Sequence, residues 1–132
     1  QDAWASGEMP NVDVMPFVED MASLYAWADL AICRAGALTV SELAVTGTPS
    51  LLVPLPQAID NHQMKNAEVL CKAGGACILP QSSLTDTTLA RFINDIINDA
   101  ARLSIMSECA RAWSKPNATR DVVLVAQEVA CG

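Results

Sequence analysis

Ala31-Ile-Cys-Arg-Ala-Gly-Ala-Leu-Thr-Val-Ser-Glu-Leu-Ala44 changes character twice, from an apolar run to a tight turn and then to a helical pattern. Residues 29–33 form a short, mostly apolar run of strand length, and Ala35-Gly36 joins the two smallest residue types in a turn. Apolar and polar positions then recur three or four residues apart, which predicts a helix over residues 38–46. A strand, a glycine turn and a helix in this order are typical of parallel α/β folds.

The beginning of the predicted helix is a candidate anion site. Its first backbone N–H groups have no partner within the helix, and the helix dipole adds a partial positive charge there. Gly36 has no Cβ to keep a phosphate away from the backbone. Thr39 and Ser41 add hydroxyl donors, and the Glu42 carboxylate suits a ribose diol. Two alternatives are an ordinary turn that binds nothing and a capping box formed by Thr39 and Glu42.

The same alternation continues along the chain. We expect strands at residues 12–15, 29–33, 50–53 and 76–79. We expect helices at residues 21–28 with Asp20 as cap, 38–46, 61–73, from 82–85 to about 97, 101–113, and 120–129 with Thr119 as cap. This order predicts an α/β fold, a Rossmann-like parallel sheet with helices on both faces, as a single domain over residues 1–132.

A second polar group opens the predicted helix after strand 50–53, in the string Asp60-Asn61-His62-Gln63. The carboxyl ends of neighbouring parallel strands meet at one edge of a sheet, where α/β proteins bind ligands. His62, Gln63 and Asn66 offer donors and acceptors that suit sugar hydroxyls. The alternative is again local, because Asp60 and Gln63 also have the spacing of a capping box.

Composition excludes several classes. The 132 residues carry a net charge of −7 without a basic cluster, which argues against a nucleic-acid partner. No apolar run approaches the roughly 18 residues of a membrane-spanning helix. Five cysteines without C-x-x-C spacing predict buried reduced thiols in a cytoplasmic protein, and a single histidine makes a zinc site improbable, so no metal or cofactor is expected. Because the chain begins with Gln1, we expect it to be a piece of something longer.

Several strings resemble the MurG family, the bacterial UDP-N-acetylglucosamine transferases of peptidoglycan synthesis. They occur in the family's order and are Pro16-Phe-Val-Glu-Asp-Met21, Arg34-Ala-Gly-Ala-Leu-Thr-Val-Ser-Glu42, Asp60-Asn-His-Gln63 with Asn66-Ala67, and Lys115-Pro-Asn-Ala-Thr-Arg120. The resemblance covers about residues 12–130. It implies the C-terminal, UDP-sugar-binding domain of a two-domain GT-B glycosyltransferase, incomplete at its N-terminal side and without the acceptor domain.

The resemblance also implies an activity, which is inverting transfer of N-acetylglucosamine from UDP to lipid I, giving lipid II. The family's presumed general base belongs to the missing domain, so we expect no catalytic residue here and no activity from this chain alone. The expected location is the cytoplasm, peripheral to the inner face of the cell membrane. By resemblance the substrate-binding residues are Phe17, Val18, Met21, Arg34, Gly36, Ala37, Leu38, Thr39, Glu42, His62, Gln63 and Asn66.

The resemblance assigns these residues to parts of UDP-N-acetylglucosamine. The uracil contacts would be Phe17, Val18 and Met21, and the diphosphate would bind to the backbone amides of Leu38 and Thr39. Glu42 would accept from the ribose hydroxyls, while His62 and Gln63 would contact the amino sugar.

Two alternatives stay open at this point. One is the catalytic subunit of a two-chain UDP-N-acetylglucosamine transferase acting on dolichol-linked sugars, which has a similar glycine turn. The other is a non-catalytic module that binds nucleotide sugars.

Overall fold

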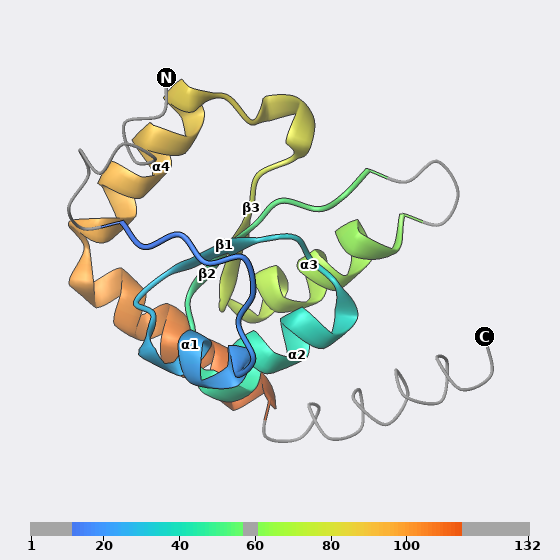
Figure 1. The fold of residues 1–132 in the computed structure, drawn as a ribbon, viewed down its shortest axis with the longest axis vertical. Helices are drawn as coiled ribbons and strands as arrows, with labels where there is room; N and C mark the ends of the chain where they lie inside the picture. Colours follow the sequence, from blue (N-terminus) through green and yellow to red (C-terminus); the bar gives the residue numbers. More distant parts are fainter. Residues whose placement is uncertain (1–11, 57–60, 115–132) are drawn as a thin grey trace.

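The computed structural model describes residues 12–56 and 61–114, which form a layered α/β unit around a parallel sheet (Figure 1). The strands are β1 (Ala31–Cys33), β2 (Ser50–Leu52) and β3 (Ala76–Ile78), in the spatial order β1-β2-β3. The helices are α1 (Met21–Trp27), α2 (Ala37–Thr46), α3 (His62–Ala73), the 3-10 turn η1 (Gln81–Ser83), α4 (Asp86–Ile97) and a helix over residues 100–114. The expected fold class is confirmed.

Alternate residues of each strand face opposite sides of the sheet. On one side, Ala31, Leu52 and Ala76 join the main core together with Leu43 of α2 and Leu70 of α3. Helices α1, α2 and α3 lie next to one another there, because α2 contacts both of its neighbours (Figure 1).

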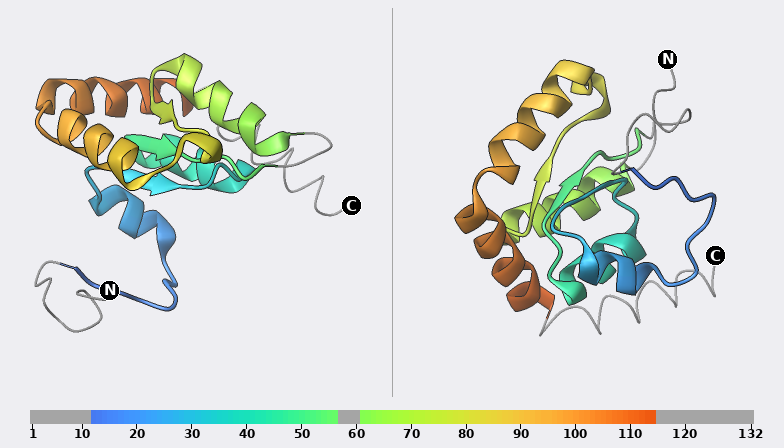
Figure 2. Two further views of the ribbon diagram at one scale, coloured as in Figure 1. Left: turned by 90° about the horizontal axis from the view of Figure 1, so that it is seen from above. Right: turned by 60° about the vertical axis from the view of Figure 1, so that its left-hand side comes forward.

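The other side of the sheet is covered by the later helices, as the further views show (Figure 2). Ile32 of β1 shares an apolar pocket with Ile93 and Ile96 of α4, and Arg102 donates to the Cys77 sulfur at 3.3 Å. Helices therefore pack on both faces of the sheet, as the sequence predicted.

Local sequence sets most helix ends. The Asp20 carboxylate caps α1 by accepting from the Ser23 N–H at 3.1 Å and from its hydroxyl at 2.6 Å, and these bonds lower the pKa of Asp20. Thr85 caps α4 in a capping box with Thr88. Gly47 ends α2 with a φ of 65°, in the left-handed region that favours glycine.

The helix over residues 100–114 crosses the amino ends of the strands. A Cβ on Gly75, which directly precedes β3, would lie 2.9 Å from the Ala110 methyl, so the two backbones pack in close contact. Arg111 reaches over Gly47 and donates to the Thr46 carbonyl at 3.4 Å. This edge of the sheet is therefore filled by protein, whereas α2 and α3 begin at the opposite, carboxyl edge.

The structure shows that one predicted strand is wrong and that the other predicted strands are shorter. Residues 12–15 do not form a strand, and Val14 and Met15 are exposed there. Apolar alternation predicted the strand, but a strand needs a neighbour to pair with, and the described sheet contains none for this segment. The strands predicted at 29–33, 50–53 and 76–79 are shorter by one or two residues, and the helix predicted at 120–129 lies outside the described residues.

In the described part of the chain, no helix is both long and apolar enough to cross a membrane.

Candidate functional site

The amino end of α2 is uncapped. Gly36 is its N-cap residue in an extended conformation, and no described side chain hydrogen-bonds there. The first helical bond runs from the Val40 N–H to the Gly36 carbonyl at 2.9 Å, so the amides of residues 37–39 precede the helical ladder. Leu38 is 54% exposed, which leaves this end open to solvent.

The capping box considered for Thr39 and Glu42 does not form, and that alternative is wrong. Because α2 begins at Ala37, one residue earlier than predicted, Thr39 is the third residue of the helix and not its cap. The hydroxyl of Thr39 instead lies within hydrogen-bonding reach of Tyr25.

Gly36 is a glycine that neither the backbone nor the packing requires. Its φ of −62° suits any residue, and among the described residues a Cβ there would meet only the Thr39 hydroxyl oxygen, at 3.8 Å. The φ angle and the packing therefore leave room for a side chain at Gly36, whereas a ligand close to the backbone would require a glycine there.

The amino end of α3 lies beside that of α2. Its N-cap, Asn61, adopts the left-handed region with a φ of 53°, which asparagine tolerates better than most residues, and no described side chain caps it. The predicted partner Asp60 lies outside the described residues. Gln63 is turned toward α2, since its oxygen accepts from the backbone N–H of Ala35 at 3.2 Å. The two helix starts thus share one edge of the sheet, as predicted.

The turn between β1 and α2 is held by three side chains. Besides Gln63, which also accepts from the Leu55 N–H at 2.8 Å, Asn66 donates to the Ala35 carbonyl at 3.0 Å. Arg34 donates to the Val53 carbonyl at 3.3 Å, so its described partner is a backbone group.

Glu42 projects from the second turn of α2 and is half-buried. It lines a cavity of about 120 Å³ between α1 and α2, together with Ala22 and Val45. The buried Tyr25 lies nearby, and burial is the main reason that its pKa is raised; the charges of Cys33 and Glu42 act in the same direction, while the hydrogen bond with Thr39 opposes it.

The raised pKa of Tyr25 predicts a loss of stability at alkaline pH. The folded state favours the neutral phenol, so the stabilisation is complete below the ordinary pKa of 10.0 and disappears as the pH rises through the folded-state value. Urea unfolding of the chain and of its Tyr25→Phe variant should give a constant difference in free energy below that pH and a shrinking one above it. A difference that is independent of pH would contradict this prediction.

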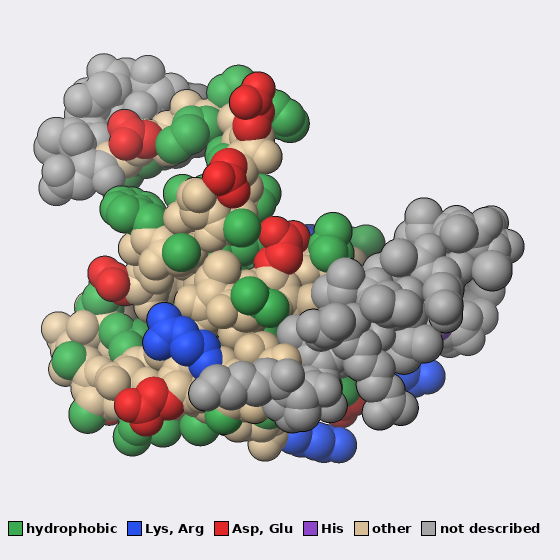
Figure 3. Space-filling view, turned by 90° about the horizontal axis from the view of Figure 1, so that it is seen from below, with side chains coloured by type: hydrophobic (Ala, Val, Ile, Leu, Met, Phe, Trp, Pro, Cys, Tyr) green, Lys and Arg blue, Asp and Glu red, His purple; other side chains and the backbone are tan. Residues whose placement is uncertain are grey.

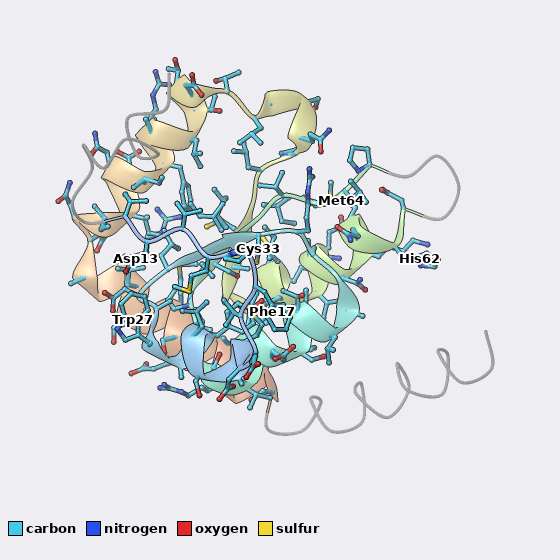
Figure 4. The ribbon with its side chains drawn as sticks, viewed as in Figure 1. Asp13, Phe17, Trp27, Cys33, His62 and Met64 are labelled. Carbon is cyan, nitrogen blue, oxygen red and sulfur yellow. The ribbon has the colours of Figure 1, made fainter. Side chains whose placement is uncertain are left out.

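The expected uracil contacts lie in different surroundings. Phe17 is 72% exposed, whereas Met21 packs against the core. In Figure 4, His62 lies at the outer end of α3, far from Phe17 and Cys33, so only an extended ligand could contact both ends. The sequence offered no signal for the carbonyl and amide partners at Val53 and Leu55, because backbone groups carry no residue identity.

Four cysteines fall within the described residues, and all are free and half-buried. They were expected to be buried, and the two predicted in strands, Cys33 and Cys77, do lie there. Burial raises the pKa of Cys33, which favours its neutral thiol.

In the described ranges, no group of three or more His, Cys, Asp and Glu side chains is arranged to hold a metal ion. On the face shown in Figure 3, Lys and Arg side chains lie in separate places.

Comparison with known proteins shows which family the chain belongs to. Residues 1–122 match the glycosyltransferase family 28 C-terminal domain. The chain is 53% identical, over 122 residues, to proteins from Ectopseudomonas mendocina and Azotobacter vinelandii, each named UDP-N-acetylglucosamine--N-acetylmuramyl-(pentapeptide) pyrophosphoryl-undecaprenol N-acetylglucosamine transferase. These matches cover 92% of the chain and 34% of each relative, so the chain spans about a third of their length.

Two solved structures are similar in fold. Acinetobacter baumannii MurG superposes with a TM-score of 0.75 at 45% identity, covering 89% of this chain and 35% of that one. A structure described as the glycotransferase of kitacinnamycin superposes with a TM-score of 0.60 at 26% identity, covering 89% of this chain and 30% of that one. With residues 1–122 matched, the chain belongs to glycosyltransferase family 28, of which it carries the C-terminal domain.

Proposed function

We propose that this chain binds UDP-N-acetylglucosamine, with the diphosphate at the amino end of α2. The observation that carries the proposal is the uncapped helix start at the carboxyl edge of the sheet, where the amides of residues 37–39 have no side-chain cap. Such a start favours a phosphate through its amide donors and the helix dipole. Arg34, Gly36, Ala37, Leu38 and Thr39 form this part of the proposed site.

The nucleoside and the sugar extend to either side of the diphosphate in this proposal. Glu42 accepts from the ribose hydroxyls, and Phe17, Val18 and Met21 contact the uracil. The sugar lies toward α3, near His62, Gln63 and Asn66. Support comes from the neighbouring helix starts and from the names of relatives that share 53% of matched residues.

We further propose that this domain serves an inverting hexosyltransferase that converts lipid I to lipid II. The helix start would stabilise the charge that develops on the leaving UDP, which is electrostatic stabilisation of the transition state. The lipid-linked acceptor and the general base would be supplied by the rest of a protein as long as its relatives, so the 132 residues alone should be inactive. A cytoplasmic, peripheral association with the membrane and roles in cell-wall synthesis, cell shape and cell division follow from the lipid substrate.

The decisive experiment is a structure with the ligand bound. We refer to a protein of its relatives' length that contains these 132 residues as the long form. Crystals of the long form with UDP-N-acetylglucosamine should place the diphosphate within hydrogen-bonding distance of the Leu38 and Thr39 amides. Ligand bound elsewhere would contradict the assignment of the site.

Donor binding should not depend on a divalent cation, because backbone amides and not a metal hold the diphosphate. Calorimetric titration of the long form with UDP-N-acetylglucosamine should give the same Kd with EDTA as with added Mg²⁺. An affinity that falls when EDTA is present would point to a cation bridging the phosphates.

A further inference from the structure

Both backbone polar groups of Ala35 are held by side chains from one face of α3. Its N–H group donates to the Gln63 oxygen at 3.2 Å, and the carbonyl of the same residue accepts from the Asn66 amide nitrogen at 3.0 Å. Residues three apart lie on one face of a helix, so both side chains reach the turn together. Ala35 is fully buried, which removes water as an alternative partner for these groups.

The Gln63 oxygen has a second donor in the Leu55 N–H, at 2.8 Å. Because both partners are N–H donors, the atom that faces them must be the oxygen of the Gln63 side-chain amide and not its nitrogen. One atom thereby joins the turn after β1 to the segment after β2, and both segments lie at the edge where α2 begins.

We propose that Gln63 and Asn66 are positioning residues, which fix the start of α2 so that its free amides point at the diphosphate. The proposal rests on the proposed function and deepens it. Ala35 is separated from Ala37 by Gly36 alone, so a rotation of the peptide groups on either side of Ala35 would change the direction of the α2 start. Direct contact with the sugar would be a different role, and the two roles predict different results.

The test compares UDP with UDP-N-acetylglucosamine. Gln63→Met keeps the length of the side chain and removes the acceptor. If Gln63 positions the α2 start, the long form should lose affinity for UDP, which lacks the sugar, by about tenfold, which corresponds to about 1.4 kcal/mol, and affinity for UDP-N-acetylglucosamine by at least as much. If Gln63 acts only through the sugar, UDP affinity should stay unchanged, and that result would overturn the proposal.

Amide hydrogen exchange provides a readout that needs no ligand. The Ala35 N–H should exchange about tenfold faster in Gln63→Met, while Gln63→Glu, whose carboxylate can accept from both amides, should restore slow exchange. Unchanged exchange at Ala35 in Gln63→Met would overturn the proposal. Glu68→Gln, on an exposed position of α3, is the matched control and should alter neither measurement.

The two proposals can fail separately. A long form that binds neither UDP nor UDP-N-acetylglucosamine contradicts the proposed function. It also contradicts the idea that the amides at the α2 start bind a diphosphate. The exchange rate of the Ala35 N–H then still decides whether Gln63 holds the turn.

Discussion

Replacing Gly36 with alanine is expected to weaken UDP binding by at least tenfold while the protein stays folded. The added methyl group would occupy the space in front of the α2 start, where, apart from the residues adjacent to Gly36, the Thr39 hydroxyl is the only group in the described part of the chain that lies within 4 Å. A phosphate kept away from the backbone loses hydrogen bonds to a charged group, each worth about 1.5–3 kcal/mol. The measurement is calorimetric titration of the long form with UDP.

Stability should hardly change in the same variant, because two small effects oppose each other. Alanine restricts the unfolded chain, which stabilises the fold by about 0.4–1 kcal/mol, but it is a poorer N-cap than glycine. The φ of −62° adds no strain for alanine. Unchanged UDP affinity in a folded Gly36→Ala protein would show that no anion approaches the backbone there.

Glu42→Gln is expected to weaken binding of UDP-N-acetylglucosamine by about 1.5–3 kcal/mol, the range for a hydrogen bond to a charged group. The substitution preserves shape and removes one negative charge near a proposed diphosphate. If Glu42 did not touch the ligand, removing its charge would weaken the repulsion between this residue and the diphosphate, and the affinity for UDP-N-acetylglucosamine would stay equal or rise. A loss of affinity would therefore indicate a direct bond to the ribose.

Thermal unfolding of the same variant serves as its control. Glu42 caps no helix end, since α2 begins at Ala37 with Gly36 as its N-cap, so the melting temperature should stay close to that of the parent. A protein that melts earlier and binds as before would give Glu42 a structural role. A Glu68→Gln protein, altered on the exposed face of α3, should match the parent in both respects.

The architecture could be predicted from local signals. Strand positions and helix ends depend mainly on residues that are close in sequence, such as the apolar runs before Arg34 and Pro54 and the glycines at 47 and 74. The predicted strands and helix ends therefore lie close to the observed ones. The strand predicted at residues 12–15 failed, because its formation depends on a pairing partner and not on its own alternation.

The site was predictable in part. The position of the two helix starts at one edge follows from parallel strand order, and the structure brings Gln63 and Asn66 to the turn after β1. The spacing of Asp60 and Gln63 fits a capping box, whereas the Gln63 oxygen accepts from two distant backbone amides. Such hydrogen bonds form between segments that are brought together by the fold, so the spacing of residues along the sequence cannot predict them.

The parallel pairing of β1, β2 and β3 has a consequence for how quickly the chain folds. Neither pair can close as a hairpin, because a helix must first bring the next strand back to the same edge. Each pairing therefore waits for a long loop to close, which raises the entropic barrier before any stabilising contact forms. Refolding should be slower than in a helical bundle of this length, and a stopped-flow experiment would measure the rate directly.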